Sequence, residues 1–370
     1  MKRMKLLMLT RYDRLGASSR VRSHLYLPWL KDAGIDATVS ALFSDDYVSR
    51  LQRGQKRLSE IATAYPARLR ALGEAKDFEL IWIEKEALPW LPFWIEANLF
   101  PRDVPYVLDY DDAIFHYYDT HERRFVRAVL GGKIPALMRG AELVLAGNRY
   151  LGDFARRSGA RRLEILPTVI DLQRYGEEAL ARRCDRAEPP LIGWIGQRAT
   201  APLLLPYRDL FARMSASGIA RFAAVGIDAA AHGLSMESVP WTEETEVASV
   251  ARFDIGIMPL VDKPFERGKC GYKLVQYMAC GLPVVASPVG VNRQLVEHGV
   301  NGFLAETMEQ WESSLRALLF DADLRRRMGQ AGRRKVEREY CVQVTGPRFA
   351  SLLMEAAGRR VDHDTFSKTH

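Results

Sequence analysis

The stretch ERGKCGYKLVQYMACGLPVVASPVG, residues Glu266–Gly290, places two lysines, a helical run, a Gly-Leu-Pro break and an apolar run in close succession. Residues Tyr272–Cys280 are predicted to form a helix, because the Gly-Leu-Pro sequence at 281–283 is typical of a helix end. The run VVAS that follows is typical of a buried strand, as is FDIGIMPL at residues 253–260. The segment therefore predicts a strand, a glycine-bearing loop at Glu266–Gly271, a helix and a second strand, which is a unit of a parallel α/β sheet.

The same alternation of short apolar runs and longer helical segments extends over the whole chain. Residues Val21–Asp32 are one predicted helix of the first half. The predicted strands are KLLMLT, the run around Ala37–Phe43, ELIWIE, YVLDYD and ELVLAG in the first half, and PLIGWIG, RFAAVGI, FDIGIMPL and PVVAS in the second. Two such sets predict two parallel sheets in tandem, with a ligand in a central cleft that faces the carboxyl ends of the strands.

The polar, charged stretch Gly176–Pro190 separates the two sets and is the expected domain boundary. We expect an N-terminal α/β domain at 1–178 and a C-terminal α/β domain at 186–345. We expect a C-terminal helix and tail at 346–370. Packing of this helix on the N-terminal domain is one of the arrangements that we consider.

Length and composition set limits on the class of protein. A chain of 370 residues with 48% apolar residues can bury two ordinary cores. No run of about 18 apolar residues lacks a charge, and the N-terminal apolar run is too short for a signal peptide, so a cytoplasmic location is expected. The four cysteines are scattered, which disfavours a disulfide framework or a zinc site and favours buried thiols. They are Cys184, Cys270, Cys280 and Cys341.

The net charge of +7 is concentrated in the first half, because residues 1–175 contribute +6 of it. Two segments, at 49–76 and 123–139, mix Arg and Lys with apolar residues. Such basic amphipathic helices can lie on an anionic membrane surface, here the inner face of the plasma membrane, although an ordinary solvated face is the alternative. The aromatic segment ALPWLPFWIEANLF, residues 87–100, is either part of that surface or a buried element. No nucleic-acid-reading motif accompanies the charge, so no nucleic-acid partner is expected.

The loop in LTRYDRLGASSRVR, residues 9–22, follows the first predicted strand and leads into a helix. Its residues Gly16, Ala17, Ser18 and Ser19 offer backbone amides that could hold an anion. The alternative is an ordinary loop with a serine helix cap. A dinucleotide dehydrogenase is disfavoured, because the G-x-G-x-x-G pattern and its acidic partner are missing.

A cluster of carboxylates follows the strand in VLDYDDAIFHYYD, residues 107–119. Asp109, Asp111 and Asp112 come first, and His116 and Asp119 follow. The cluster could be a metal-binding pair or a solvated helix cap, and no further ligand spacing supports a metal site. An acid/base role or a contact with a substrate hydroxyl fits the position at a strand end better.

The loop and helix start at Gly268–Gln276 suit a diphosphate. Glycines at 268 and 271 let backbone amides approach a ligand, the helix N-terminus favours negative charge, and Lys269 and Lys273 add positive charge. The alternative is a capped core helix with two exposed lysines. At the carboxyl edge of a second sheet, phosphate binding is favoured.

The chain resembles the family-4 glycosyltransferases, which have the GT-B fold of two Rossmann-like domains. The resemblance implies that the domain at 1–178 lies on the acceptor side and that the domain at 186–345 binds the nucleotide-sugar. The resemblance is most specific in YMACGLPVVASPVGVNRQLVEHGVNGFLAE, residues 277–306. It extends to GASSRVRSHLYLPWLKDAGID, GNRYL, ILPTVIDLQRY and DADLRRRMGQAGRRKVEREY, and so covers nearly the whole chain.

The chain departs from the family at the two glutamates of the donor-site motif. Aligning Gly271 with the family's loop glycine puts Gly268 at the first glutamate and Gln276 at the second, while Glu266 lies two residues early. The resemblance implies that the first glutamate holds the transferred sugar and that the second contacts the donor ribose. Gln276 could still make the contact with the ribose. The family usually has an arginine and a lysine after the first strand of the C-terminal domain. In this chain only Arg198 lies near that position. These departures indicate either a divergent subgroup or a weakened catalyst.

The resemblance implies transfer of a sugar from a UDP- or GDP-sugar, with retention at the anomeric carbon and without a required cofactor or metal. It implies that the departing diphosphate is stabilised by Lys269, Lys273 and Arg198 and by the amides of Tyr272 and Lys273. The remaining donor contacts that it implies are Gln276 with the ribose, Trp241 with the base, and Gly290, Val291 and Asn292 beside the sugar. The expected catalytic side chains are Asp109, Asp111, His116 and Lys273.

Three functions are compatible with the sequence. The first is a glycosyltransferase that builds a surface polysaccharide or glycolipid on a glycan or lipid-linked acceptor. The second is a protein that binds nucleotide-sugar without turnover, since both motif acids are missing. The third is a sugar-nucleotide epimerase of the same fold, which needs no acceptor, but nothing in the sequence indicates its acid/base residues.

Overall fold

The computed structural model of the chain describes residues 3–55, 58–176 and 189–359. It divides into two compact units. The first unit consists of residues 1–168, 267–270 and 342–370, and the second of residues 169–266 and 271–341. The expected domain boundary at 178–186 and Cys184 lie outside the described residues.

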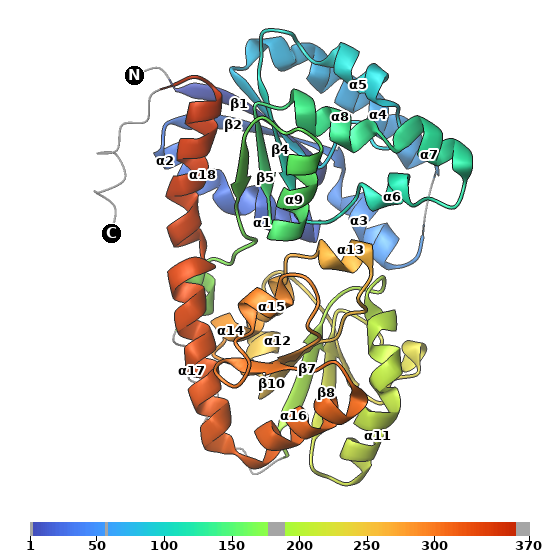
Figure 1. Cartoon of the computed structure of the whole chain (residues 1–370), viewed down its shortest axis with the longest axis vertical. Helices are drawn as coiled ribbons and strands as arrows, with labels where there is room; N and C mark the ends of the chain where they lie inside the picture. Colours follow the sequence, from blue (N-terminus) through green and yellow to red (C-terminus); the bar gives the residue numbers. More distant parts are fainter. Residues whose placement is uncertain (1–2, 56–57, 177–188, 360–370) are drawn as a thin grey trace. The chain divides into compact units, whose positions relative to one another are not determined.

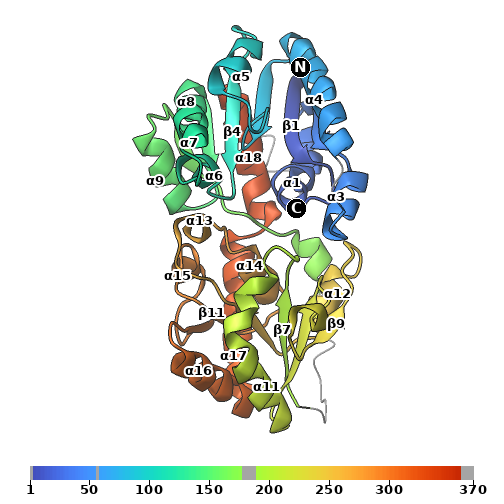
Figure 2. The same cartoon turned by 90° about the vertical axis from the view of Figure 1, so that its right-hand side faces the viewer.

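A parallel six-stranded sheet forms the centre of the first unit, in the order β2-β1-β3-β4-β5-β6. Its strands are β1 (Met4–Tyr12), β2 (Ile35–Phe43), β3 (Leu80–Glu84), β4 (Tyr106–Tyr110), β5 (Leu143–Ala146) and β6 (Leu163–Ile165). Every residue of β3 and β5 is buried. Helices cover both faces of the sheet, as Figures 1 and 2 show. Because a parallel sheet covered in this way is buried on both sides, these strands are continuous apolar runs.

The helices of the first unit mostly follow the strands they connect. They are α1 (Ala17–Arg22), η1 (His24–Tyr26), α2 (Leu27–Asp32), α3 (Asp45–Gln52), α4 (Leu58–Glu74), η2 (Ala75–Asp77), α5 (Phe93–Leu99), α6 (His116–Asp119), α7 (Arg124–Leu130), α8 (Lys133–Gly140), α9 (Arg149–Arg157) and α18 (Val342–Ala356). The prediction of one helix at Val21–Asp32 was wrong. Pro28 lies in the first turn of α2, where its missing amide is tolerated, but it cannot continue a helix from the preceding turn.

The last helix, α18, belongs to the first unit although it ends the described chain. It lies beside α2 (Figure 1). The hydroxyls of Tyr26 and Thr345 are 3.0 Å apart, and the rings of Tyr26 and Phe349 are 4.6 Å apart between centroids. A Cβ on Gly346 would lie 2.5 Å from the ring of Trp29, so the helix backbone packs directly on that indole. The C-terminal helix therefore completes the core of the first unit.

The second unit has its own parallel six-stranded sheet, in the order β12-β11-β10-β7-β8-β9. Its strands are β7 (Leu191–Ile195), β8 (Arg221–Val225), β9 (Glu237–Val239), β10 (Ile255–Met258), β11 (Val284–Ala286) and β12 (Gly302–Leu304). Its helices are η3 (Leu172–Tyr175), η4 (Ala201–Tyr207), α11 (Arg208–Ala216), η5 (Ala230–His232), α12 (Glu246–Ala251), α13 (Pro264–Arg267, whose last residue belongs to the first unit), α14 (Tyr272–Ala279), α15 (Asn292–Leu295), α16 (Met308–Phe320) and α17 (Ala322–Glu339).

Alternating side chains of the second sheet build two separate cores. Leu191 and Ile195 of β7 pack with residues of α12 and α14, whereas Ile192 and Trp194 pack with residues of α11 and α16. This is the period of two that a strand imposes on its side chains. The α/β class with two parallel sheets, predicted from the sequence, is confirmed.

The segment Glu266–Gly290 folds largely as predicted. The helix is α14, its C-cap is Cys280, and Gly281 follows with a φ of +64°. The strand VVAS is β11. The loop is shorter than predicted, because Glu266 and Arg267 belong to the helical turn α13, which begins at Pro264.

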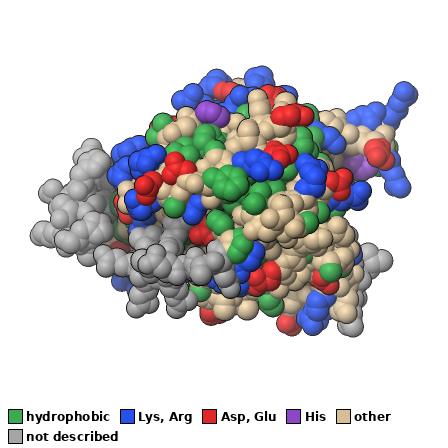
Figure 3. Space-filling view, turned by 90° about the horizontal axis from the view of Figure 1, so that it is seen from below, with side chains coloured by type: hydrophobic (Ala, Val, Ile, Leu, Met, Phe, Trp, Pro, Cys, Tyr) green, Lys and Arg blue, Asp and Glu red, His purple; other side chains and the backbone are tan. Residues whose placement is uncertain are grey.

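Two further expectations concern cysteines and membranes. Cys270, Cys280 and Cys341 are buried thiols, as predicted. Within the described ranges, none of the helices combines the length and the apolar character needed to cross a membrane. Basic and acidic side chains are interspersed over the coloured part of the face in Figure 3, so that face presents mixed charge.

Candidate functional site

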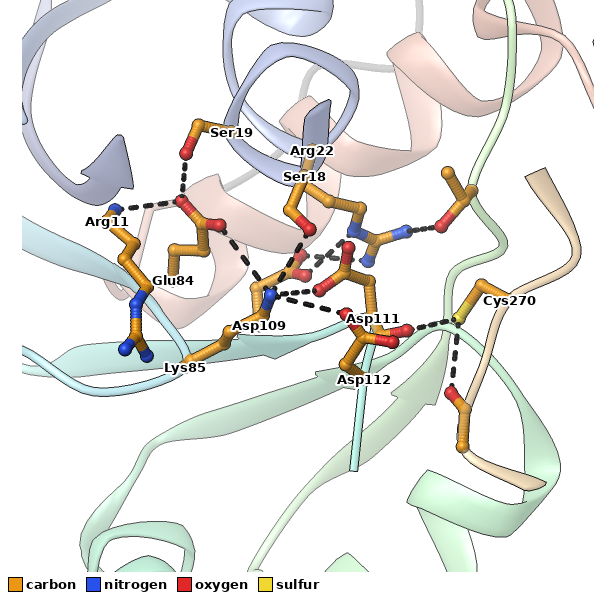
Figure 4. A network of polar contacts seen from close by, with 12 residues as sticks. Arg11, Ser18, Ser19, Arg22, Glu84, Lys85, Asp109, Asp111, Asp112 and Cys270 are labelled. Carbon is orange, nitrogen blue, oxygen red and sulfur yellow. Dashed lines mark hydrogen bonds and ion pairs between the residues drawn. The ribbon is translucent and has the colours of Figure 1, made fainter. Parts of the chain in front are cut away.

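The carboxyl edge of the first sheet carries a buried network of charged side chains (Figure 4). The network joins the loop after β1 to the ends of β3 and β4. Glu84, Lys85 and Asp109 have at most 6% of their surface exposed. Charges buried to this extent are retained only when they are paired and hydrogen-bonded, so each contact in the network matters.

Asp109 forms a bidentate ion pair with Arg22. Its Oδ1 accepts from Arg22 Nε at 2.8 Å and its Oδ2 from Arg22 Nη2 at 2.9 Å. Arg22 Nη1 also donates to the carbonyls of Leu166 and Pro167, at 2.8 and 3.0 Å. Burial raises the pKa of Asp109 to about 6, although Arg22 acts in the opposite direction. Both carboxylate oxygens are occupied, which favours a structural role for Asp109 over the predicted catalytic one.

Glu84 holds the loop that was predicted to bind an anion. Its Oε2 accepts from Ser19 Oγ at 2.7 Å and from the amide of Arg11 at 2.9 Å. Burial raises the pKa of Glu84. Gly16 and Ala17 lie at the start of the short helix α1, where the Gly16 amide donates to Asp13 O at 3.0 Å. The Ser19 hydroxyl is thus engaged within the protein.

Lys85 lies at the centre of the network. Its Nζ is 2.9 Å from Asp111 Oδ1 and 3.7 Å from Asp112 Oδ2, and it donates to Ser18 Oγ at 3.2 Å. Burial opposes ionisation of Asp111, but Lys85 outweighs it and holds the pKa of Asp111 below its usual value. Burial and the neighbouring Asp111 raise the pKa of Asp112. The result is one firmly ionised carboxylate beside one that is protonated more easily.

Residues Arg267–Cys270 belong to the first unit and contact the same edge. Asn148 Nδ2 donates to the carbonyls of Gly268 and Lys269, at 2.9 and 3.0 Å. Lys269 Nζ lies 3.7 Å from Asp112 Oδ1, and Cys270 Sγ donates to Asp111 O at 3.1 Å. A Cβ at Gly268 would lie 2.5 Å from Ala113 Cβ, so this contact requires glycine.

His116 lies one helical turn after the carboxylates, at the start of α6. Its Nδ1 is 2.9 Å from Asp119 Oδ1, and its Nε2 is 2.8 Å from the Tyr150 hydroxyl. Which nitrogen donates depends on the tautomer. Both ring nitrogens therefore have protein partners in the structure.

In the second unit, Gly271 is the N-cap of α14, and its φ of +69° is a left-handed conformation. A Cβ there would lie 2.3 Å from Leu295 Cδ1 and 3.0 Å from Val291 Cγ1, so both backbone conformation and space require glycine. The structure thereby brings the predicted residues Gly271, Val291 and Asn292 together. Asn292 is fully buried, and its Oδ1 has no hydrogen-bond partner in the described part of the chain.

The side chains predicted to surround the helix start occupy defined positions. Lys273 Nζ lies 4.8 Å from the centre of the Trp194 ring, a cation–π contact that also places its charge at the end of β7. Gln276 is 2% exposed, and its Nε2 donates to the Tyr175 hydroxyl at 3.4 Å.

Two other predicted donor-site residues lie after β7 and β9. Trp241 Nε1 donates to the buried Glu246 Oε2 at 2.9 Å, which fixes the orientation of the indole. Arg198, after β7, is exposed. Tyr272 is the first residue of α14, and Gly290, with a φ of +53°, lies just before Val291.

The geometry of the two units agrees with known structures. Sucrose-phosphate synthase from Thermosynechococcus elongatus superposes with a TM-score of 0.71 at 15% identity, over 95% of this chain and 99% of that one. Anabaena Alr3699/HepE in complex with UDP-glucose superposes with a TM-score of 0.69 at 18% identity, over 95% and 100%. Residues 203–321 match the family of glycosyl transferases group 1.

The chain has the GT-B fold, and the segment that matches the glycosyl transferases group 1 lies in its second unit. A curated relative, the D-inositol 3-phosphate glycosyltransferase of Thermobispora bispora, is 31% identical over 150 residues, which is 39% of this chain. The match spans only 34% of that relative's length.

Sequence reasoning missed the residues that organise the N-terminal half of this GT-B chain. Lys85, Glu84 and Arg22 were not singled out, although charged residues that directly follow the apolar run LIWI were a usable signal. Several of their partners lie far away in sequence, since Ser19 and Glu84 are 65 residues apart and Arg22 and Asp109 are 87 residues apart. Such pairs become visible only in the folded chain.

Proposed function

We propose that the protein is a retaining glycosyltransferase that moves a sugar from a UDP- or GDP-sugar to a glycan or lipid-linked acceptor, in surface polysaccharide or glycolipid synthesis. The observation that carries the proposal is the start of α14, inside the segment 203–321 that matches the glycosyl transferases group 1. There Gly271 packs against Val291 and Lys273 lies over the Trp194 ring. The GT-B fold, the glycosyltransferase match and the UDP-glucose bound to Anabaena HepE support it.

The donor diphosphate would be bound at the N-terminus of α14. A helix N-terminus carries partial positive charge, and its first amides have no partner within the helix. Lys273 adds a full charge, so the negative charge that develops on the departing diphosphate is stabilised without reorganisation. The other contacts we assign are Tyr272 and Arg198 with phosphate, Gln276 with the ribose, Trp241 with the base, and Gly290, Val291 and Asn292 beside the sugar.

The positions that the resemblance assigns to the two motif glutamates bear on this site. Gly268 occupies the position of the first glutamate, and its carbonyl accepts a hydrogen bond from Asn148. Its backbone therefore stabilises the first unit. Gln276 occupies the position of the second glutamate and is buried against Tyr175. We therefore assign the protein to a subgroup in which an amide replaces the carboxylate at the ribose, and Lys269 serves the first unit through Asp112.

The acceptor is assigned to the carboxyl edge of the first sheet. Asp111 is held ionised by Lys85 and can accept a hydrogen bond from an acceptor hydroxyl. Asp112, whose side chain is 27% exposed, offers a second carboxylate. Asp109 positions Arg22, and His116 supports this edge through Asp119 and Tyr150.

The first unit would bind the inner face of the plasma membrane to reach a lipid-linked acceptor. On α7, the side chains of Phe125 and Val129 are exposed by 77% and 40%, next to Arg124. On α4, Ile61 and Leu69 are exposed by 36% and 43%. Exposed apolar side chains beside arginines suit the headgroup layer of an anionic membrane. Lys56 and Arg57, counted in this segment from the sequence, lie outside the described residues.

The experiment that tests the function incubates the protein with UDP- and GDP-sugars, with and without a membrane extract as acceptor, and follows release of nucleoside diphosphate. Acceptor-dependent release with incorporation of labelled sugar is expected. Saturable donor binding without release would support a nucleotide-sugar-binding protein instead. Conversion of the donor sugar without acceptor would support an epimerase.

A further inference from the structure

The loop that follows β3 contains the two non-glycine residues with positive φ in the described ranges 3–55, 58–176 and 189–359. They are Lys85, with a φ of +66°, and Trp90, with a φ of +62°. This conformation is unfavourable for a bulky side chain and persists only where the surroundings impose it. Residues of this kind cluster at binding and active sites. The loop therefore merits a functional explanation.

Buried charged side chains bond to the loop between Lys85 and Trp90. Lys133, 1% exposed, lies 2.7 Å from Glu86 Oε2 and 2.9 Å from Glu96 Oε2. Its Nζ also donates to Leu88 O at 2.6 Å, and Glu96 Oε1 accepts from the amide of Ala87 at 2.7 Å. The backbone amide of Ala87 and the carbonyl of Leu88 are thus each bonded to a buried ionic group, which makes the middle of the loop rigid.

The same network ends at Trp90. The Tyr118 hydroxyl donates to Glu86 Oε1 at 2.8 Å and accepts from the Trp90 amide at 3.0 Å. The Trp90 ring lies nearly perpendicular to the rings of Tyr118 and His121, with centroids 5.2 and 6.0 Å away. These contacts fix the orientation of the indole, yet the residue remains 48% exposed. The fold holds a large aromatic surface rigidly toward solvent.

We propose that Trp90 is a stacking platform for a pyranose ring of the acceptor, and that the loop Lys85–Trp90 is the acceptor-recognition element. The C–H groups on one face of a pyranose form an apolar surface that packs on an aromatic ring, while its hydroxyls need polar partners. The loop offers both, because Trp90 stands at one end and Lys85, with Asp111 and Asp112, at the other. The proposal rests on the proposed transferase function and specifies the chemical class of its acceptor.

Rigidity distinguishes a sugar platform from a membrane contact. Binding through one ring gains affinity when the ring is already oriented, since less freedom is lost on binding. Insertion of a side chain into a lipid headgroup layer requires only that the side chain is exposed, and not that its orientation is fixed. Trp94 on α5 is more exposed, at 65%, and has an ordinary helical backbone. Trp94 is therefore the matched control.

The test uses full-length protein labelled with 5-fluorotryptophan and observed by fluorine NMR, with the Trp90 signal assigned from its loss in Trp90→Phe. The probes are the methyl glycosides of glucose, galactose, mannose and N-acetylglucosamine. At least one is expected to shift the Trp90 signal saturably and to leave the Trp94 signal in place. Trp90→Gly, which relieves the backbone strain, should weaken binding of that glycoside about tenfold in saturation-transfer NMR. Trp94→Ala should not.

The proposal is overturned if none of the four glycosides shifts the Trp90 signal. It is also overturned if that signal responds only to phosphatidylglycerol vesicles, which would make Trp90 a membrane contact. Thermal stabilisation of the unsubstituted protein by UDP or GDP is measured in parallel. Stabilisation without any response of Trp90 refutes the platform alone, whereas a response of Trp90 without stabilisation refutes the proposed donor and leaves sugar binding standing.

Discussion

Replacing Lys85 by methionine tests whether the buried network organises the first unit. Methionine keeps most of the side-chain volume and the same backbone strain, so the change removes mainly the ammonium group. Asp111, 2.9 Å from Nζ, would then be a buried carboxylate without its main partner, and Glu84 and Asp112 would lose a neighbouring charge.

The expected loss follows from the burial of this pair. The side chains of Lys85 and Asp111 are only 7% and 10% exposed. Breaking a buried ion pair by removing one partner typically costs about 3–5 kcal/mol. For a unit of this size, that loss lowers the melting temperature of the first unit by roughly 6–20 °C.

The effect should also depend on pH, with a definite sign. In the unsubstituted protein Lys85 holds the pKa of Asp111 low, so the stability that Asp111 contributes is present above its unfolded pKa of about 3.9. In Lys85→Met, burial raises the pKa of Asp111 above that value. The destabilisation is therefore largest near pH 8 and shrinks as the pH falls through the raised pKa, since the buried carboxyl becomes neutral.

The assay is calorimetric unfolding at several pH values between 5 and 8, with Lys269→Met as the matched control. Lys269 lies 3.7 Å from Asp112 and its side chain is 21% exposed, so its loss should cost at most about 1 kcal/mol. The reasoning is refuted if the two substitutions destabilise equally, or if the deficit of Lys85→Met does not decrease toward pH 5.

Three further predictions follow from the proposed function. Lys273→Ala should weaken binding of UDP or GDP by roughly tenfold to more than a hundredfold, because a charge-assisted contact is worth about 1.5–3 kcal/mol; an unchanged Kd in titration calorimetry would remove α14 from the donor site. Sugar transfer should persist in EDTA, because Lys273 and a helix N-terminus can neutralise a diphosphate; activity that disappears and returns with manganese or magnesium would revive a metal site at Asp109–Asp112. The protein should float with anionic liposomes at low salt and less at moderate salt, since each Lys or Arg near the surface adds about 1 kcal/mol before screening; equal recovery with neutral vesicles, or no binding at either salt, would exclude the membrane surface.

The strands that could be predicted most directly are continuous apolar runs. LIWI and LVLA have no polar interruption, so they could be recognised without partners. The strand β2 was predicted from its apolar residues although Asp36 and Thr38 are exposed. The strands β6, β9 and β12 were not predicted, because each has three residues of which at most one is buried, whereas the equally short β11 is an entirely buried apolar run. The α1–α2 break was missed because the helical apolar spacing continues past Pro28.

The candidate site was predictable where local sequence determines the geometry. Gly271 and the start of α14 could be placed, because a glycine before an apolar run and a Gly-Leu-Pro ending mark both ends of a helix. The pairing of Asp109 with Arg22 and of Asp111 with Lys85 could not be placed, because it depends on the order of β1, β3 and β4 in the sheet. Trp90 was considered only as part of an aromatic segment, since neither its strained backbone nor its support by Lys133 can be read from composition.

The packing of α18 on α2 affects how the protein is made. Trp29 emerges from the ribosome early, but the helix whose Gly346 packs against it is synthesised more than three hundred residues later. At about 5–20 residues per second, the interval lasts tens of seconds. During that time the first sheet can form, while the surface around Tyr26 and Trp29 lacks its cover and is exposed to aggregation. Completion of the first unit therefore comes last in biosynthesis, although its strands are translated first.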